Sequence, residues 1–170
     1  AYALYAFTWQ SATGFLPTYL KAKELSPFVA NASFALLFVV GALVKPLAGG
    51  LGDRVPRGLL APAVLVVAAG SLLGLVFASA PLVALVAVAA FAAGLLAYPP
   101  VMQAYLMDSF PGDSMGGDLG AMRSIYIGIG SLGTTYVGVV AQFLDYDTAF
   151  TSLVGCLLLS SVVIVLRGRE

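Results

Sequence analysis

The sequence predicts an all-α membrane protein with six transmembrane helices. Of its 170 residues, 61% are hydrophobic and only 9% are charged, whereas a soluble domain has about 45 to 50% apolar and about 25% charged residues. The mean hydropathy of +1.01 agrees. A membrane-spanning helix takes roughly 20 apolar residues, so the chain has room for six spans if the connections are short. Because every backbone N–H and C=O group in hydrocarbon needs an internal partner, each apolar segment is expected to be a helix.

Proline, glycine and charged residues divide the chain into six apolar segments. These are expected at about residues 2–20, 28–49, 59–79, 82–107, 119–144 and 149–166. The connections are a polar link at 21–27, a charged, glycine-rich loop at 50–58, a near-hairpin at 80–81, a long acidic link at 108–118 and a short link at 145–148. Consecutive segments are therefore expected to cross the membrane in opposite directions.

The first segment mixes aromatic and polar side chains with aliphatic ones. Tyr2, Tyr5 and Trp9 share one helical face, and Trp9 and Gln10 fall near the middle of the membrane. Two interpretations of the tyrosines stay open, because they are either cavity side chains or an aromatic belt at the membrane interface.

The second and fifth segments each present a face of mostly small or polar residues at helical spacing. The second-segment face holds Asn31, Ala35, Phe38, Ala42, Lys45 and Gly49; the fifth-segment face holds Ser124, Gly128, Ser131, Thr135, Gly138 and Gln142. Small faces let helix backbones approach closely. These faces indicate either packing inside this bundle or a seam against a second bundle.

The fourth segment is interrupted by adjacent prolines. Tyr98, Pro99, Pro100 and Gln103 lie close together in its second half. The prolines remove two backbone N–H donors and kink the helix, leaving upstream carbonyls that need another partner. The break is either a gating hinge or a fixed bend.

The order of segment types repeats after about residue 80. Segments one and four carry aromatics and a glutamine, segments two and five carry the cations Lys45 and Arg123, and segments three and six carry neither. Two three-helix units of opposite topology are typical of secondary transporters. We therefore divide the single bundle, residues 1–170, into inverted repeats at about 1–80 and 81–170.

Basic residues gather on one side of the predicted membrane. That side holds Lys45, Arg54, Arg57, Arg123, Arg167 and Arg169, and the other holds only Lys21 and Lys23. The positive-inside rule places the richer side, and with it both chain ends, in the cytoplasm. Because the chain enters an apolar stretch at Ala1 without the charged region and cleavage site of a signal peptide, we expect a fragment whose upstream part is missing.

The absent residue types exclude most enzyme classes. The chain contains no histidine and one cysteine, Cys156, which excludes Ser-His-Asp triads, His-based zinc sites, cysteine clusters and disulfides. Eight acidic and eight basic residues cancel, so nothing indicates a nucleic-acid partner. We expect neither an enzyme nor a cofactor or metal; the expected surroundings are a lipid bilayer.

The loop after the second segment carries the most specific signal. Residues 49–58 read GGLGDRVPRG, which resembles the signature loop of the major facilitator superfamily, approximately G-x-x-x-D-R-x-G-R-[RK]. The matching positions are Gly49, Asp53, Arg54 and Arg57. Pro56 stands where the family has glycine, and Gly58 where it has a basic residue.

The resemblance covers the whole chain and implies one six-helix half of a twelve-helix secondary transporter that works by alternating access. The stretch GLLAYPP at 94–100 is similar to the tenth helix of the family, and the arginine that N-terminal halves carry in the corresponding helix is absent. We therefore expect the C-terminal half, helices seven to twelve, with an N-terminal half and a small solute as partners.

The resemblance also implies roles for individual residues. In the family the loop latches the cytoplasmic face, which implies gating by the four matching residues, with Asp108 and Arg123 as local partners. Solvated charges that only determine topology are the alternative. Gly49 is expected to permit close backbone approach, and Asp53 to accept hydrogen bonds from a neighbouring helix N-terminus. The first and fourth helices line the family's cavity, which points to the substrate contacts Trp9, Gln10, Tyr98 and Gln103.

Lys45 is the cation nearest the membrane interior. It lies four residues before Gly49, about 6 Å at about 1.5 Å per residue, so it can snorkel to the cytoplasm. Alternatively, Lys45-Pro46 resembles the Arg-Pro of the eighth helix of monocarboxylate transporters, which implies an organic anion as solute. Lysine replaces arginine here, and Gly41 stands where that branch has an acid.

Two other functions stay open. One is a self-contained six-helix channel or membrane scaffold that works as a homo-oligomer. The other is efflux of an amphiphilic compound in place of organic-anion transport.

Overall fold

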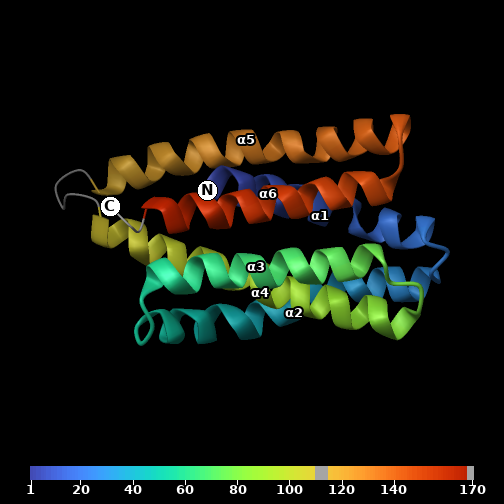
Figure 1. The fold of residues 1–170 in the computed structure, drawn as a ribbon, viewed down its shortest axis with the longest axis horizontal. Helices are drawn as coiled ribbons and strands as arrows, with labels where there is room; N and C mark the ends of the chain where they lie inside the picture. Colours follow the sequence, from blue (N-terminus) through green and yellow to red (C-terminus); the bar gives the residue numbers. More distant parts are fainter. Residues whose placement is uncertain (110–114, 168–170) are drawn as a thin grey trace.

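The computed structural model describes residues 1–109 and 115–167, which form six helices and no strands. The helices are α1 (Tyr2–Ala22), α2 (Pro27–Gly52), α3 (Arg57–Val76), α4 (Pro81–Ser109), α5 (Met115–Phe143) and α6 (Tyr146–Arg167). They lie side by side in one bundle (Figure 1). The all-helical, six-helix prediction is confirmed, although part of the acidic link and Arg169 lie outside the described residues.

Five of these helices, α2 to α6, are long and apolar enough to cross a membrane. α1 has 21 residues but is outside this group, because polar side chains such as Thr8, Gln10, Ser11 and Thr13 lower its hydropathy. Thr8 and Ser11 are fully buried against the bundle. The chain is therefore a multi-pass membrane protein in which α1 turns part of its polar surface inward.

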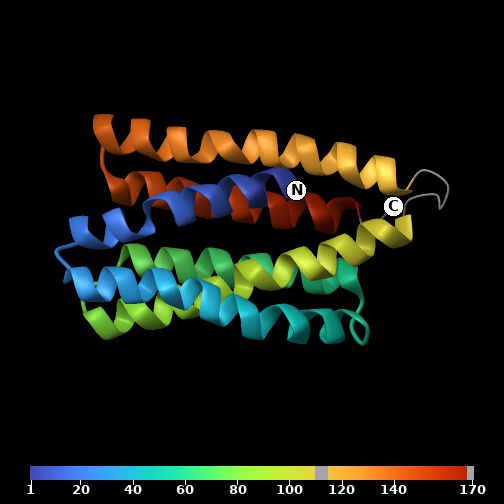
Figure 2. The ribbon, with the colours of Figure 1, turned by 180° about the vertical axis from the view of Figure 1, so that it is seen from behind.

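The helix pairs relate the two halves of the chain. α1 makes its most extensive contacts with α5, and α2 packs extensively on α4, while α3 lies against both α4 and α6. Figure 2 shows α1 between α5 and α2. Exchanging the first three helices with the last three converts the α1–α5 pair into the α4–α2 pair, as an inverted repeat requires. The boundary between the repeats stays a prediction.

Glycines allow close contacts within two of these pairs. A Cβ on Gly94 of α4 would lie 2.6 Å from the Ala68 backbone nitrogen and 2.7 Å from the Val64 carbonyl oxygen of α3. A Cβ on Gly130 of α5 would lie 2.9 Å from the Ala6 Cβ of α1. Close backbone approach through small residues is how membrane helices gain packing contacts, so these glycines set the helix spacing.

Side-chain caps fix the starts of α2 and α6. The Ser26 hydroxyl oxygen accepts the Val29 N–H at 3.3 Å, and the Asp145 carboxylate accepts the Thr148 N–H at 2.6 Å. These bonds satisfy donors that a helix start leaves unpaired. The same Thr148 N–H lowers the pKa of the Asp145 carboxyl, since it stabilises the charged form.

Candidate functional site

One guanidinium at the start of α3 contacts the ends of two other helices, α2 and α4. Arg57, the first residue of α3, donates from Nε to the Gly52 carbonyl oxygen of α2 at 3.2 Å. One terminal nitrogen donates to the Asp53 carboxylate at 3.3 Å, and the other pairs with the Asp108 carboxylate near the end of α4. The structure thus brings together Asp53, Arg57 and Asp108, which we call the loop cluster.

Two expectations for this loop are wrong. A Cβ on Gly49 would meet no described atom within 4 Å, because α2 continues past it and Gly52 is the buried glycine there. Asp53 is the C-cap of α2, so its carboxylate lies one turn before Arg57 and accepts from that side chain, not from a described helix N-terminus.

Two other basic residues stay outside the loop cluster. The Arg54 side chain is exposed, and within the described residues it forms no ion pair. Arg123, expected as a local partner, is exposed on α5 and forms no described ion pair with the loop. α4 and α5 make few contacts, which explains why Arg123 does not reach the cluster.

The loop cluster is exposed to solvent. The side chains of Asp53 and Asp108 are 72% and 70% exposed, and that of Arg57 is 23% exposed. Exposed ion pairs contribute about 0 to 1 kcal/mol each. Contacts of this strength form and break readily, which suits a reversible tie between helix ends better than a structural anchor.

Trp9 lies on the part of α1 that faces α2, and Gln10 is the next residue of the same helix. The Trp9 ring meets Phe38 edge to face with centroids 6.2 Å apart, and Phe38 meets Phe34 in the same way at 5.2 Å. Trp9 and Gln10 are half-buried, and Phe38 is 50% exposed. These three rings therefore form an aromatic surface that the apolar part of a solute can contact. The sequence assigns Phe38 to the small face of the second segment and does not predict its contact with Trp9.

Lys45 follows Phe38 on the same side of α2. Seven residues are close to two helical turns, or about 10 Å along the axis. The Lys45 side chain is exposed and forms no ion pair with a described residue. Trp9, Phe38 and Lys45 thus give one side of the bundle an aromatic patch followed by a cation.

Tyr98 and Gln103 instead contact the first turn of α1. Tyr98 is fully buried, with its ring centroid 5.3 Å from that of Tyr2 and 4.8 Å from that of Tyr5. Gln103 is exposed and donates its side-chain amide to the Tyr2 hydroxyl at 3.4 Å. In this conformation Tyr98 offers no surface to a solute, so only Gln103 of this pair is accessible.

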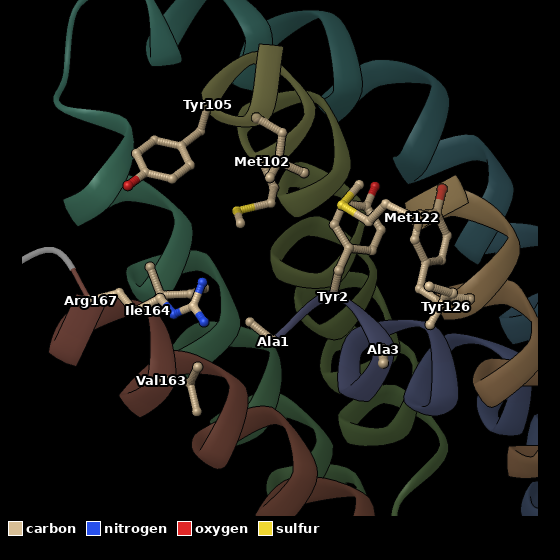
Figure 3. A pocket seen from close by; sticks show the side chains of 12 residues that line it. Ala1, Tyr2, Ala3, Met102, Tyr105, Met122, Tyr126, Val163, Ile164 and Arg167 are labelled. Carbon is tan, nitrogen blue, oxygen red and sulfur yellow. The ribbon is translucent and has the colours of Figure 1, made fainter. Parts of the chain in front are cut away.

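A cavity of about 660 Å³ opens beside these tyrosines. It lies between the start of α1 and parts of α4, α5 and α6 (Figure 3). A hollow of about 160 Å³ shares Met122 and Tyr126 with it and adds Gln103 and Arg123. The sequence did not single out Met122 or Tyr126; their i, i+4 spacing was the available signal. The larger cavity is mainly apolar, with Arg167 as its cation.

α4 continues as a helix through Pro99 and Pro100. Both prolines are half-buried, between the buried Tyr98 and Val101. The described structure shows one conformation of α4, so the hinge stays a prediction.

The small faces of α2 and α5 point out of the bundle. On α2, Asn31, Ala35, Phe38, Ala42 and Lys45 are exposed; on α5, Ser124, Gly128, Ser131, Thr135 and Gln142 are exposed. α5 instead packs inward with Gly130, Gly133 and Val137. Phe38 contacts Trp9 and Gly138 is half-buried, but packing inside this bundle leaves most of both faces uncovered.

The described residues contain no group of three or more His, Cys, Asp or Glu side chains that could hold a metal ion.

Comparison with known proteins identifies one family. The sequence profile described as Major Facilitator Superfamily matches residues 1–170. A search of curated proteins finds no match.

Proposed function

Because the chain belongs to the major facilitator superfamily and so to a secondary transporter, we propose that it is the C-terminal six-helix half, working by alternating access against a second bundle. The family consists of transporters and not enzymes.

The exposed small faces of α2 and α5 carry the proposal of a second bundle. Asn31 and Gln142 are amides, and Ser124, Ser131 and Thr135 are hydroxyls, all on exposed positions. The Ser124 and Ser131 hydroxyls donate to carbonyl oxygens of their own helix, so packing is what supports the proposal. Small residues facing lipid lose the close contacts that they provide against another helix, and a second bundle seated on both faces supplies those contacts.

The distribution of basic residues supports cytoplasmic chain ends. Arg54 and Arg57 follow α2 and Arg167 ends α6, whereas Lys21 and Lys23 lie at the end of α1. In an up-and-down bundle these sets fall at opposite ends. The positive-inside rule then places the arginine end in the cytoplasm.

An organic anion is the solute that the α1–α2 side favours. Trp9 and Phe38 provide aromatic surface for its body, and Lys45 lies about 10 Å further along the same side of α2. A cation in a poorly solvated cavity attracts a carboxylate more strongly than one in water. Efflux of an amphiphilic compound is the second candidate, favoured by the mainly apolar cavity of about 660 Å³.

Site-specific photo-crosslinking tests the second bundle. A benzophenone side chain replaces Ser131, on the small face of α5, or Leu159, which is 53% exposed on α6, in membranes expressing the complete reading frame. We expect capture of an upstream six-helix bundle from position 131 and no protein capture from position 159.

Two results would overturn the proposal. Capture of a second copy of this chain from position 131 would favour the homo-oligomeric channel or scaffold. A reading frame without a second bundle would remove the transporter-half assignment.

A further inference from the structure

The end of α1 is held by contacts to two other helices. The Tyr19 hydroxyl donates to the Asp147 carboxylate of α6 at 2.6 Å, and the Tyr19 ring stacks on Phe150 with centroids 4.0 Å apart. Lys23 donates to the Val76 carbonyl oxygen at the end of α3 at 2.6 Å and lies 3.5 Å from the Asp147 carboxylate. We call Tyr19, Lys23 and Asp147 the α1 clasp.

Lys23 and Asp147 of the α1 clasp have opposite charges, and each also lies at a helix end that favours its charge. Lys23 satisfies one of the carbonyls that the end of α3 leaves unpaired, where a cation is also favoured by the helix dipole. Asp147 lies in the first turn of α6, where an anion is favoured. The Lys23 ammonium also lies 5.4 Å from the Tyr19 ring centroid, within cation–π range.

Two of the three side chains of the α1 clasp are shielded from solvent. Tyr19 is only 1% exposed and the Lys23 side chain 16% exposed, whereas the Asp147 side chain is 56% exposed. A shielded polar group is costly to leave without a partner. The Tyr19 hydroxyl and the Lys23 ammonium therefore favour the arrangement in which both are paired.

A proline interrupts the backbone hydrogen bonds of α1 just before the α1 clasp. Pro17 is inside the helix and lacks the N–H that would bond to the Thr13 carbonyl. In addition, the Thr13 hydroxyl donates to the Trp9 carbonyl oxygen at 2.9 Å and to the Gln10 carbonyl oxygen at 3.2 Å. Such a bond from a side chain to the preceding turn often bends a helix. α1 changes direction toward its C-terminal end (Figure 2).

We propose that Lys23 is a positioning residue: the α1 clasp anchors the end of α1 on α3 and α6, and through the bend at Pro17 this anchor sets Trp9 against Phe38 of α2. The anchoring depends only on contacts within this chain. The consequence for a solute rests on the proposed function, which makes Trp9 and Gln10 transport residues.

Trp9 is the single tryptophan of these 170 residues, so in proteoliposomes of the 170-residue chain its fluorescence reports this position directly. Lys23→Met keeps the apolar stem and removes the donors and the charge. We expect acrylamide quenching of Trp9 to rise by about twofold, as the Trp9–Phe38 contact populates open arrangements. Lys23→Arg should restore the wild-type quenching, and Lys21→Met, at an exposed cation two residues earlier, should leave it unchanged.

If the α1 clasp only stabilises the fold and does not position Trp9, the quenching experiment gives a different result. Lys23→Met would then lower the melting temperature while Trp9 quenching in the folded protein stayed at the wild-type value, and this result would overturn the proposal. If Lys23→Met does not fold, Asp147→Asn provides the same test with a smaller shift in the same direction. Absence of saturable uptake by the complete protein, with its upstream part, would contradict the proposed function and leave the quenching result valid.

Discussion

At the residue scale, the position of a charge decides what it can do. Arg57 and Lys23 each join three helix ends, and their own side chains are 23% and 16% exposed. The carboxylates that pair with Arg57 are 72% and 70% exposed, and the Asp147 carboxylate beside Lys23 is 56% exposed. The Lys23 arrangement also contains the buried Tyr19, whose hydroxyl donates to Asp147. Lys45 differs from both, because it is exposed and unpaired within the described residues.

The loop cluster gives the first prediction. Asp53→Asn should reduce transport by the complete protein by up to about fivefold while leaving insertion and abundance nearly unchanged, because an exposed pair contributes at most about 1 kcal/mol. Arg57→Ala should have the larger effect, since it removes the contacts to Gly52, Asp53 and Asp108. Initial uptake rates normalised to membrane abundance provide the measurement.

Arg54→Ala is the matched control, because this neighbouring arginine forms no described ion pair. Full activity of both Asp53→Asn and Arg57→Ala would remove the gating role of the loop cluster.

Lys45 gives the second prediction. With radiolabelled benzoate as the probe anion, Lys45→Arg should retain partial uptake and Lys45→Ala should lose it, because only arginine keeps the charge near the aromatic patch. The measurement is concentration-dependent uptake into proteoliposomes containing the complete protein. Equal uptake by the alanine variant would show that Lys45 snorkels and serves no solute.

At the element scale, helix existence followed from composition, but helix ends did not. α2 was expected to end near residue 49 and continues to Gly52, where the Arg57 side chain satisfies a carbonyl oxygen of the last turn. α4 was expected to stop near residue 107 and reaches Ser109. Hydrophobic periodicity locates a helix and leaves its last turn undetermined.

Which side chains meet was harder to predict than which segments are helical. The pairing of Arg57 with Asp108 involves charges at helix ends, where the short connections limit the choices. The burial of Tyr98 and the contact between Trp9 and Phe38 depend on how each helix is rotated in the bundle. Periodicity defines a face and does not say which neighbour covers it.

The glycine contacts give the third prediction. Gly94→Ala and Gly130→Ala should each destabilise the bundle by about 1 to 3 kcal/mol, because the added Cβ overpacks a close helix contact. The effect of Gly94→Ala should be larger, since its Cβ would meet backbone atoms of α3 at 2.6 and 2.7 Å. Thermal unfolding of the detergent-solubilised protein provides the measurement.

Gly74→Ala and Gly128→Ala serve as controls, because a Cβ at either position meets no described atom within 4 Å. If all four variants melted alike, these contacts would not determine the helix spacing.

The cap of α6 gives the fourth prediction, on pH dependence. The Thr148 N–H lowers the pKa of Asp145 in the folded protein, so the capping contribution is complete above the ordinary carboxyl pKa and is lost as the pH falls through the lowered one. Wild type should melt above Asp145→Ala at pH 7, and the difference should shrink below about pH 4. A difference independent of pH would show that the carboxylate charge does not contribute.

At the scale of the whole molecule, the bundle has a packed core, but two of its faces have no covering helix within the described residues. The core joins all six helices through buried residues such as Tyr19, Tyr98, Phe91 and Phe150. The small, partly polar faces of α2 and α5 remain exposed. A cavity between two bundles would have only one wall in this chain, so we expect the 170 residues to need a second bundle for transport.

Uptake by the isolated and the completed protein tests this claim most directly. The 170-residue chain is reconstituted alone or after co-expression with the upstream part of its reading frame, and uptake of radiolabelled benzoate and of a fluorescent amphiphilic dye is measured. We predict insertion of the isolated chain without saturable uptake of either probe, and saturable uptake of one of them after co-expression. Saturable uptake by the isolated chain would contradict the account and favour a homo-oligomer.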